Sequence, residues 1–78
     1  MKLFIGNLDE KIESHHLREA FSEYGKVKSA NVVSEKGTGK SRGFGFVEMP
    51  NDEEAREVIN KVNGGTWEGK VLNIREAY

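Results

Sequence analysis

The chain has 78 residues, with 12 lysine and arginine residues, 13 aspartate and glutamate residues and no cysteine. This length corresponds to one small domain, near the lower limit at which an apolar core alone supports folding. The absence of cysteine excludes a disulfide framework and a cysteine-ligated zinc or iron–sulfur centre. No apolar run approaches the roughly 20 residues of a membrane helix, so neither a membrane span nor a signal peptide is predicted.

The net charge of −1 is the sum of one basic segment and two acidic ones. Residues 26–42 carry a net charge of +4, whereas residues 9–25 and residues 51–60 each carry −3. The near-neutral total argues against attachment to nucleic acid by bulk charge, although a local basic segment can still bind phosphates.

The first predicted element is a strand over residues 2–6, which ends at the turn formers Gly6-Asn7. An amphipathic helix of about ten residues follows, with Glu13 or Ser14 as its cap and Gly25 as its end. Its apolar residues recur at the helical spacing i, i+3, i+4 and i+7, namely Leu17, Ala20, Phe21 and Tyr24.

A hairpin is predicted next. Residues 27–33 alternate with a period near two, and residues 34–41 contain two glycines and three charges, a composition typical of a mobile loop. Residues 42–49 form the next strand, which Pro50 ends. One face of this strand carries Arg42, Phe44, Phe46 and Glu48, and the other carries Gly43, Gly45, Val47 and Met49.

A second helix and a last strand complete the βαββαβ order. Asn51 is the expected cap of the helix, with Glu54 as its partner in a capping box. The apolar residues of this helix are Ala55, Val58, Ile59 and Val62. The helix ends at residues 63–65, and residues 70–75 are the predicted last strand. In that strand Leu72 and Ile74 face inward, whereas Val71, Asn73 and Arg75 face outward.

Three phenylalanines are expected on an uncovered sheet face. Two helices with one apolar stripe each should pack on the same face of a four-stranded antiparallel sheet, because the alternating strands offer only one apolar face. The opposite face would then carry Phe4, Phe44 and Phe46. Folding does not explain three exposed phenylalanines in a domain with so small a core, whereas an exposed apolar patch is typical of a binding surface.

Two stretches resemble the motifs of a known family. Residues 3–8, Leu-Phe-Ile-Gly-Asn-Leu, are similar to the hexapeptide motif of the RNA recognition motif family, and residues 42–49, Arg-Gly-Phe-Gly-Phe-Val-Glu-Met, to its octapeptide motif. Met49 departs from the usual Phe or Tyr, but it faces the helices and should affect only core packing. The resemblance covers the whole chain, residues 1–78, as a single domain, and suggests a small bacterial or cyanobacterial member.

The resemblance implies a fold and a function. The fold is α+β, a βαββαβ ferredoxin-like sandwich with a four-stranded antiparallel sheet and two helices packed on one face. The function is single-stranded RNA binding by base stacking: Phe4 and Phe44 would each stack under a base, Phe46 would contact ribose, and Arg42 would pair with a phosphate. The full set of predicted RNA-binding residues is Lys2, Phe4, Asn7, Lys40, Arg42, Phe44, Phe46, Asn73 and Arg75.

Several further expectations follow from this assignment. The chain is expected to be a monomer in the cytoplasm, or in the nucleus of a eukaryote, and to act in post-transcriptional regulation or RNA chaperoning. No cofactor, metal or small-molecule substrate is predicted. Single-stranded DNA is an alternative ligand, and the alternative function is a protein–protein interaction module that uses the acidic helical face.

Other patterns have plain structural interpretations. Residues 39–41, Gly-Lys-Ser, resemble the end of a phosphate-binding loop but lead into a strand, so no nucleotide hydrolysis and no other enzymatic activity is predicted. His15 and His16 should project about 100° apart on a helix and should not share a metal. Trp67 either packs beside the second helix or extends the aromatic face, and Tyr78 either stacks on a base or covers the sheet.

Overall fold

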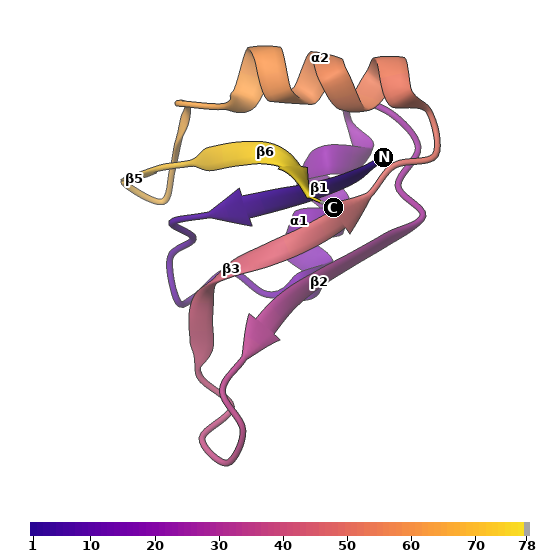
Figure 1. The fold of residues 1–78 in the computed structure, drawn as a ribbon. Helices are drawn as coiled ribbons and strands as arrows, with labels where there is room; N and C mark the ends of the chain where they lie inside the picture. Colours follow the sequence, from indigo (N-terminus) through magenta and orange to yellow (C-terminus); the bar gives the residue numbers. More distant parts are fainter. Residues whose placement is uncertain (78) are drawn as a thin grey trace.

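The computed structural model describes residues 1–77 and contains a four-stranded antiparallel sheet in the order β2-β3-β1-β6. Its strands are β1 (Lys2–Gly6), β2 (Ser29–Ser34), β3 (Ser41–Glu48) and β6 (Asn73–Ala77). Helix α1 (Ser14–Ser22) lies behind the sheet in Figure 1, and α2 (Asp52–Val62) lies alongside β6. The predicted βαββαβ architecture is confirmed.

The hydrophobic core lies between the helices and one face of the sheet. Its buried residues are Leu3, Ile5, Leu8, Ile12, Leu17, Phe21, Val27, Val47, Met49, Ala55, Val58, Leu72 and Ile74. Met49 is completely buried, so its departure from the family pattern concerns packing, as expected. Within residues 1–77, neither helix is both long enough and apolar enough to cross a membrane.

Strand register places one row of side chains across the whole uncovered face. Asn31 of β2 lies opposite Phe46 of β3, and Phe46 lies opposite Phe4 of β1. Phe4 in turn lies opposite Arg75 of β6. Directly opposed residues of antiparallel strands point to the same side of the sheet, so these four side chains share one surface.

Gly45 allows α1 to approach β3 closely. A Cβ atom at this position would lie 2.5 Å from the Asn31 carbonyl oxygen and 3.0 Å from Cδ1 of Leu17. Both distances are shorter than ordinary van der Waals contact. Because Gly45 has no side chain on the core face, α1 can lie this close to the sheet.

Helix α1 begins as predicted but ends early. Glu13 is its N-cap, one of the two expected candidates. The helix ends at Ser22, and the Tyr24 amide donates a hydrogen bond to the carbonyl oxygen of Phe21. The expectation that Tyr24 belongs to the buried stripe is wrong, because it lies beyond the last helical turn and is 44% exposed.

Glu54 links the first turn of α2 to the segment before β2. Asn51 caps α2 as predicted, since its side chain accepts a hydrogen bond from the Glu54 amide at 3.1 Å. The Glu54 carboxylate, expected to return to Asn51, instead accepts from the backbone amide of Lys26 at 3.2 Å. At Gly25 a Cβ atom would lie 2.6 Å from this carboxylate, so the close approach requires glycine there.

The predicted last strand is divided in two. Lys70–Val71 forms β5, which pairs with β4 (Thr66–Trp67) in a separate two-stranded hairpin, and β6 begins only at Asn73. Glu68 and Gly69 both adopt positive φ angles, of 51° and 77°. Two consecutive residues with positive φ make the tight turn that suits a two-residue hairpin loop. The prediction missed this hairpin, although the inward Leu72 and Ile74 are confirmed.

Candidate nucleic-acid interface

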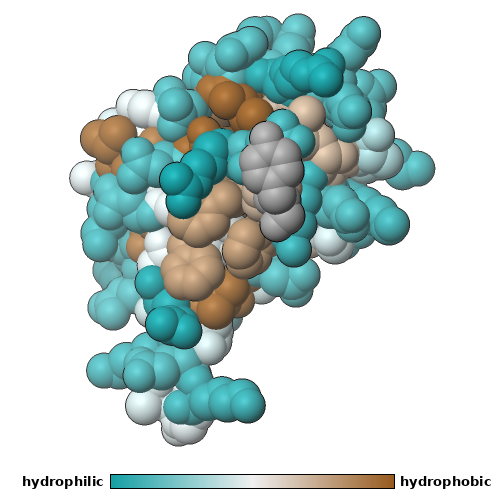
Figure 2. Space-filling view, viewed as in Figure 1, coloured by the Kyte–Doolittle hydropathy of each residue, from teal (hydrophilic) through white to brown (hydrophobic). Residues whose placement is uncertain are grey.

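Phe4, Phe44 and Phe46 form a compact cluster on the uncovered face, which we call the aromatic platform. The centroid of the Phe4 ring lies 5.7 Å from that of Phe44 and 5.9 Å from that of Phe46, and the last two are 6.1 Å apart. All three residues are partly exposed. Figure 2 shows the corresponding hydrophobic patch over the sheet, bordered by hydrophilic residues.

The three rings differ in orientation. Phe4 and Phe44 are inclined by only 30°, whereas Phe46 is nearly perpendicular to Phe44, at 89°. Two rings with similar tilt can each offer a face to successive bases of one strand, and a third, edge-on ring is suited to a smaller neighbouring group. Phe46 is therefore the ring set apart by its orientation, as it is by its predicted role.

Each ring of the platform has a cation beside it. Nζ of Lys2 lies 4.7 Å from the Phe46 centroid, Cζ of Arg75 lies 4.8 Å from that of Phe4, and Cζ of Arg42 lies 5.9 Å from that of Phe44. Such contacts contribute about 0.5–1 kcal/mol at exposed sites. They also place three positive charges around the platform.

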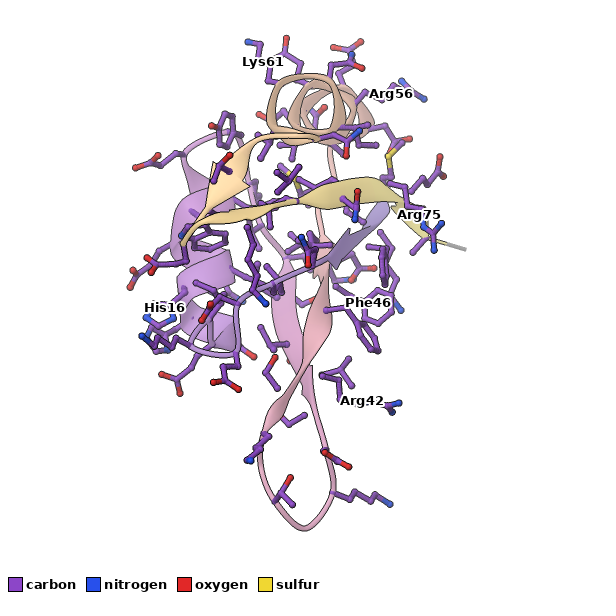
Figure 3. The ribbon with its side chains drawn as sticks, turned by 90° about the vertical axis from the view of Figure 1, so that its left-hand side faces the viewer. His16, Arg42, Phe46, Arg56, Lys61 and Arg75 are labelled. Atoms are coloured by element: carbon purple, nitrogen blue, oxygen red, sulfur yellow. The ribbon has the colours of Figure 1, made fainter. Side chains whose placement is uncertain are left out.

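Figure 3 shows that Phe46, Arg42 and Arg75 lie on the side of the sheet opposite α1, which carries His16. A hollow of about 440 Å³ beside Phe4 and Phe46 is lined by Arg75, Glu76 and Ala77. A second hollow, of about 370 Å³, is lined by Phe4, Asn63, Asn73, Ile74 and Arg75. Both hollows therefore lie where the platform meets β6.

The structure brings most of the predicted binding residues together but separates two of them. Asn73 lies opposite Gly6, in the row that also contains Phe44. Asn7 has a positive φ of 62°, and its Nδ2 donates a hydrogen bond to the carbonyl oxygen of Val71 at 2.7 Å. The side-chain amide of Asn7 therefore holds the β4–β5 hairpin next to the end of β1. Lys40 is exposed in the β2–β3 loop, which extends away from the sheet in Figure 1.

A group of polar residues beside the platform was not among the predicted binding residues. Ser29 and Asn31 of β2, together with Glu48 of β3, line a recess of about 190 Å³ next to Phe46 and Lys2. Glu48 was placed on the correct face by alternation within its own strand. The two β2 residues could be found only from the register between strands, which determines which of their side chains approach Phe46.

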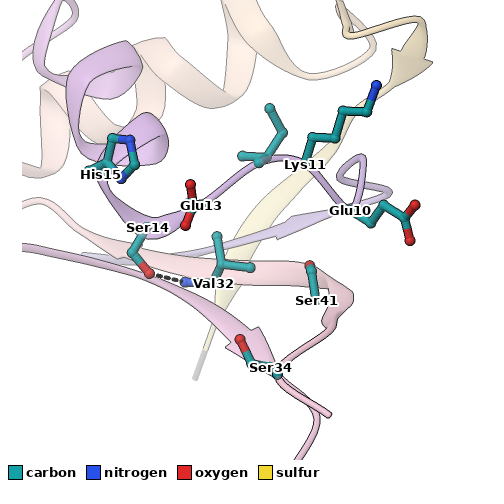
Figure 4. Close-up of a pocket in the computed structure, with 10 residues that line it drawn as sticks. Glu10, Lys11, Glu13, Ser14, His15, Val32, Ser34 and Ser41 are labelled. Carbon is teal, nitrogen blue, oxygen red and sulfur yellow. Dashed lines mark hydrogen bonds between the residues drawn. The ribbon is translucent and has the colours of Figure 1, made fainter.

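A further hollow, of about 700 Å³, lies away from the platform (Figure 4). It is lined by residues of the segment before α1 and of the β2–β3 hairpin, among them Glu10, Lys11 and Ser34. Oγ of Ser14 accepts a hydrogen bond from the Val32 amide at 2.9 Å and so ties the start of α1 to β2. None of the predicted RNA-binding residues lines this hollow.

The expected separation of His15 and His16 is wrong. Their ring centroids lie 4.0 Å apart, and potential ligand atoms of Glu13 and both histidines lie within 4.8 Å of one another. However, Nδ1 of His16 already accepts a hydrogen bond from the Glu13 amide at 2.9 Å. This bond satisfies a backbone donor at the start of α1, so helix capping accounts for the position of the His16 ring.

Trp67 packs against the core. This agrees with the first of its two predicted positions, packing beside the second helix, and not with an extension of the aromatic face. It is partly buried and shares a groove of about 310 Å³ with Phe21, Tyr24, Val62 and Leu72. It therefore belongs to the helical side of the molecule and does not extend the platform. Tyr78, for which two roles were predicted, lies outside the described residues.

Comparison with known proteins agrees with this geometry. The model of the family described as RNA recognition motif matches residues 3–73, which include the whole platform. The chain belongs to the RNA recognition motif family. Both the recognition from the two motifs and the predicted ferredoxin-like fold are thereby confirmed.

Several relatives cover nearly all of this RNA recognition motif. The 28 kDa ribonucleoprotein of Spinacia oleracea chloroplasts is 41% identical over 97% of the chain, and RbpB of the cyanobacterium Nostoc is 38% identical over 99%. The chain spans 75% of the Nostoc protein but only 33% of the Spinacia protein. A similarity to small cyanobacterial members is therefore confirmed.

Solved structures show the same fold. The crystal structure of the RNA-binding protein PG1 has a TM-score of 0.96 and 38% sequence identity, and covers 99% of this chain and 93% of its own. The second RNA recognition motif domain of the yeast poly(U)-binding protein Pub1 has a TM-score of 0.90 and 31% identity, again over 99% of this chain and 93% of its own.

Proposed function

We propose that the chain binds single-stranded RNA on the uncovered face of its sheet. The observation that carries this proposal is the cluster of three phenylalanines, each with a cation beside its ring. Aromatic faces attract splayed bases, whereas the bases of a duplex already stack on one another and cannot reach them. The names of relatives, a ribonucleoprotein and RNA-binding proteins, support the same ligand.

The proposed roles are those that the family resemblance implies, and the orientation of the rings supports them. Phe4 and Phe44 each stack under one base, and Phe46 contacts a ribose between them. Arg42 and Arg75 bind phosphates, and Lys2 supplies a third positive charge beside Phe46. Lys40 in the loop, and Asn73 and Asn7 near the end of β1, form the periphery of the interface, with the amide of Asn7 contributing through the hairpin that it fixes.

The magnitudes indicate modest affinity. Two stacked bases supply roughly 2–6 kcal/mol, and association together with ordering of the loop costs at least about 4 kcal/mol. A few phosphate contacts add to the difference. We therefore expect a Kd on the order of micromolar for a strand of about two to four nucleotides.

We further propose that residues 1–78 act as a single domain and as a monomer in the cytoplasm, in post-transcriptional regulation or RNA chaperoning. Cyanobacterial and chloroplast relatives support this setting. Single-stranded DNA is a second ligand that the same stacking surface can accept, because discrimination depends on contacts to the 2′-hydroxyl. As a member of a family of binding domains, the chain is not an enzyme.

The acidic helical face does not need a protein partner to explain it. Asp52, Glu53 and Glu54 occupy the first turn of α2, where negative charge is favourable beside the helix N-terminus. Glu57 pairs with Lys61 at 3.5 Å on the same helix. We therefore do not propose the alternative function, an interaction module.

The experiment is a binding titration of a random single-stranded RNA pool to the wild type and to the double variant Phe44→Ala, Phe46→Ala. Loss of two aromatic contacts should raise the Kd by about a hundredfold or more. Circular dichroism establishes that the variant is folded. A folded double variant that binds the pool as well as the wild type would rule out the platform as the RNA site.

A further inference from the structure

The recess beside Phe46 has walls of defined chemistry. Its volume is about 190 Å³, and it is lined by Lys2, Ser29, Asn31, Phe46 and Glu48. Glu48 lies between Ser29 and Lys2 in one row across the sheet, and the next row begins with Asn31 and Phe46. The recess therefore combines an aromatic wall with polar groups from three neighbouring strands.

The polar groups of the recess are available to a ligand. The Glu48 side chain is 43% exposed, and its nearest ionic partner is Nζ of Lys28 at 3.9 Å. An exposed pair at this distance contributes little and exchanges readily with a better partner. The ammonium group of Lys2 lies 4.7 Å from the centre of the Phe46 ring, at the edge of the same recess.

The chemistry of these groups favours one base. A carboxylate only accepts hydrogen bonds, and its two oxygens match a pair of adjacent donors. Among the standard bases, guanine alone presents two such donors side by side, at N1 and at the 2-amino group. Its O6 atom is the adjacent acceptor, which suits the donors of Lys2 and Asn31.

We propose that the recess beside Phe46 selects guanine, with Glu48 accepting from N1–H and the 2-amino group and Lys2 or Asn31 donating to O6. This inference rests on the proposed function, because the base reaches the recess only when RNA lies on the platform. It assigns Glu48 as a specificity-determining residue. The ligand of the domain is then a short single strand that contains guanine.

The other bases fit the recess less well. Uracil has a single N–H donor between two carbonyl oxygens, and an oxygen directed at the Glu48 carboxylate would be repelled. Cytosine and adenine each present one amino donor next to a ring nitrogen that only accepts. For each of them at least one oxygen of the carboxylate loses its partner, so guanine should be preferred by about tenfold.

The test compares pentanucleotides of sequence UUXUU, with X as guanosine, inosine, adenosine, cytidine or uridine, by fluorescence anisotropy. Inosine keeps N1–H and O6 but lacks the 2-amino group. The wild type should bind the guanosine strand about tenfold more tightly than the inosine strand. In Glu48→Gln this ratio should fall to within about twofold of unity, because the second acceptor is lost.

A matched control is Glu57→Gln on α2. Glu57 is also an exposed glutamate in a surface ion pair, 3.5 Å from Lys61, and its substitution changes the net charge by the same amount. This variant should keep the preference of the wild type for guanosine. Equal loss of preference in both variants would show a general charge effect and would overturn the assignment of Glu48.

The two proposals fail in different ways. If the wild type binds all five strands with equal affinity, and Phe44→Ala weakens them all, then the platform is the RNA site but the guanine assignment is wrong. If none of the strands binds, or if binding is unchanged in Phe44→Ala, then both the proposed function and this inference are wrong.

Discussion

Phe46 and Val47 are neighbours on β3, yet they belong to different parts of the molecule. Val47 is completely buried in the core, whereas Phe46 is partly exposed and lies opposite Phe4 and Asn31. The same contrast holds along β1 between Leu3 and Phe4. In each strand the alternation of side chains separates the residues that stabilise the fold from those available to bind a ligand.

This separation has a physical consequence. Burial of apolar area on the helical side supplies most of the free energy of folding. The platform, by contrast, leaves part of its apolar surface in contact with water. That surface is removed from water only when a ligand binds. Substitutions on the helical side should therefore change the stability of the fold, and substitutions on the uncovered side should change the affinity for RNA.

The largest effect is expected for Leu17→Ala on the helical side. Leu17 is completely buried and packs against Gly45, so its truncation leaves a cavity beneath the sheet. The free energy of unfolding should fall by about 2–5 kcal/mol, measured by urea denaturation. RNA affinity of the folded fraction should not change.

Val71→Ala is the control for this prediction, because Val71 is 51% exposed. Its effect on the free energy of unfolding should stay within about 0.5 kcal/mol. A Leu17→Ala variant that is as stable as this control would contradict the proposed division of the two faces.

The second prediction concerns Phe4→Ala on the uncovered side. Removal of one stacking ring should weaken binding by about 1–3 kcal/mol, or roughly 5- to 150-fold in Kd, measured by fluorescence anisotropy. Tyr24→Ala removes an aromatic residue that is 44% exposed on the helical side, and its Kd should match that of the wild type. Equal losses in both variants would mean that binding is not localised to the platform.

A smaller change in stability is expected for Asn51→Ala. Its side chain accepts the Glu54 amide at 3.1 Å, and loss of this cap should lower the free energy of unfolding by about 1 kcal/mol. The control is Asn60→Ala, at an exposed position within the same helix. The stability of both variants is measured by thermal denaturation. Both variants should bind RNA with the same affinity. A difference in affinity would mean that α2 influences the binding face, which would contradict the separation of the two faces.

The smallest effect is expected for Arg75→Ala, in the salt dependence of binding. About three phosphate contacts predict a slope of roughly −2 for log K against log salt concentration, since each contact on a single strand contributes about −0.7. Loss of Arg75 should reduce the slope by about 0.7. Arg56→Ala on the exposed side of α2 should leave the slope unchanged. A wild-type slope near zero would exclude phosphate binding at this face.

Much of this division could be predicted from the sequence. Periodicity identified both helices and the four main strands, and alternation within residues 42–49 assigned each side chain to its correct face. These patterns are informative because burial on one face repeats every second residue in a strand and every third or fourth in a helix. Alternation also placed Gly45 on the core face, where α1 approaches the sheet closely.

The errors share a physical origin in contacts that sequence periodicity does not describe. Strands β4 and β5 have two residues each, too few to show alternation, although the Glu68-Gly69 turn was a usable signal. The contact of Glu54 with Lys26 and the proximity of the His15 and His16 rings depend on specific hydrogen bonds. The recess beside Phe46 depends on the register of β2 against β3.

The central claim is that RNA binds the uncovered face and leaves the helical face free. Amide chemical-shift mapping during titration with UUGUU tests it most directly, because every described residue except Met1 and Pro50 has a backbone amide that reports on its own surroundings. The account predicts the largest shifts in Lys2–Gly6 and Ser41–Glu48, with small shifts in both helices. Shifts confined to Ser14–Ser22 and Asp52–Val62 would contradict it.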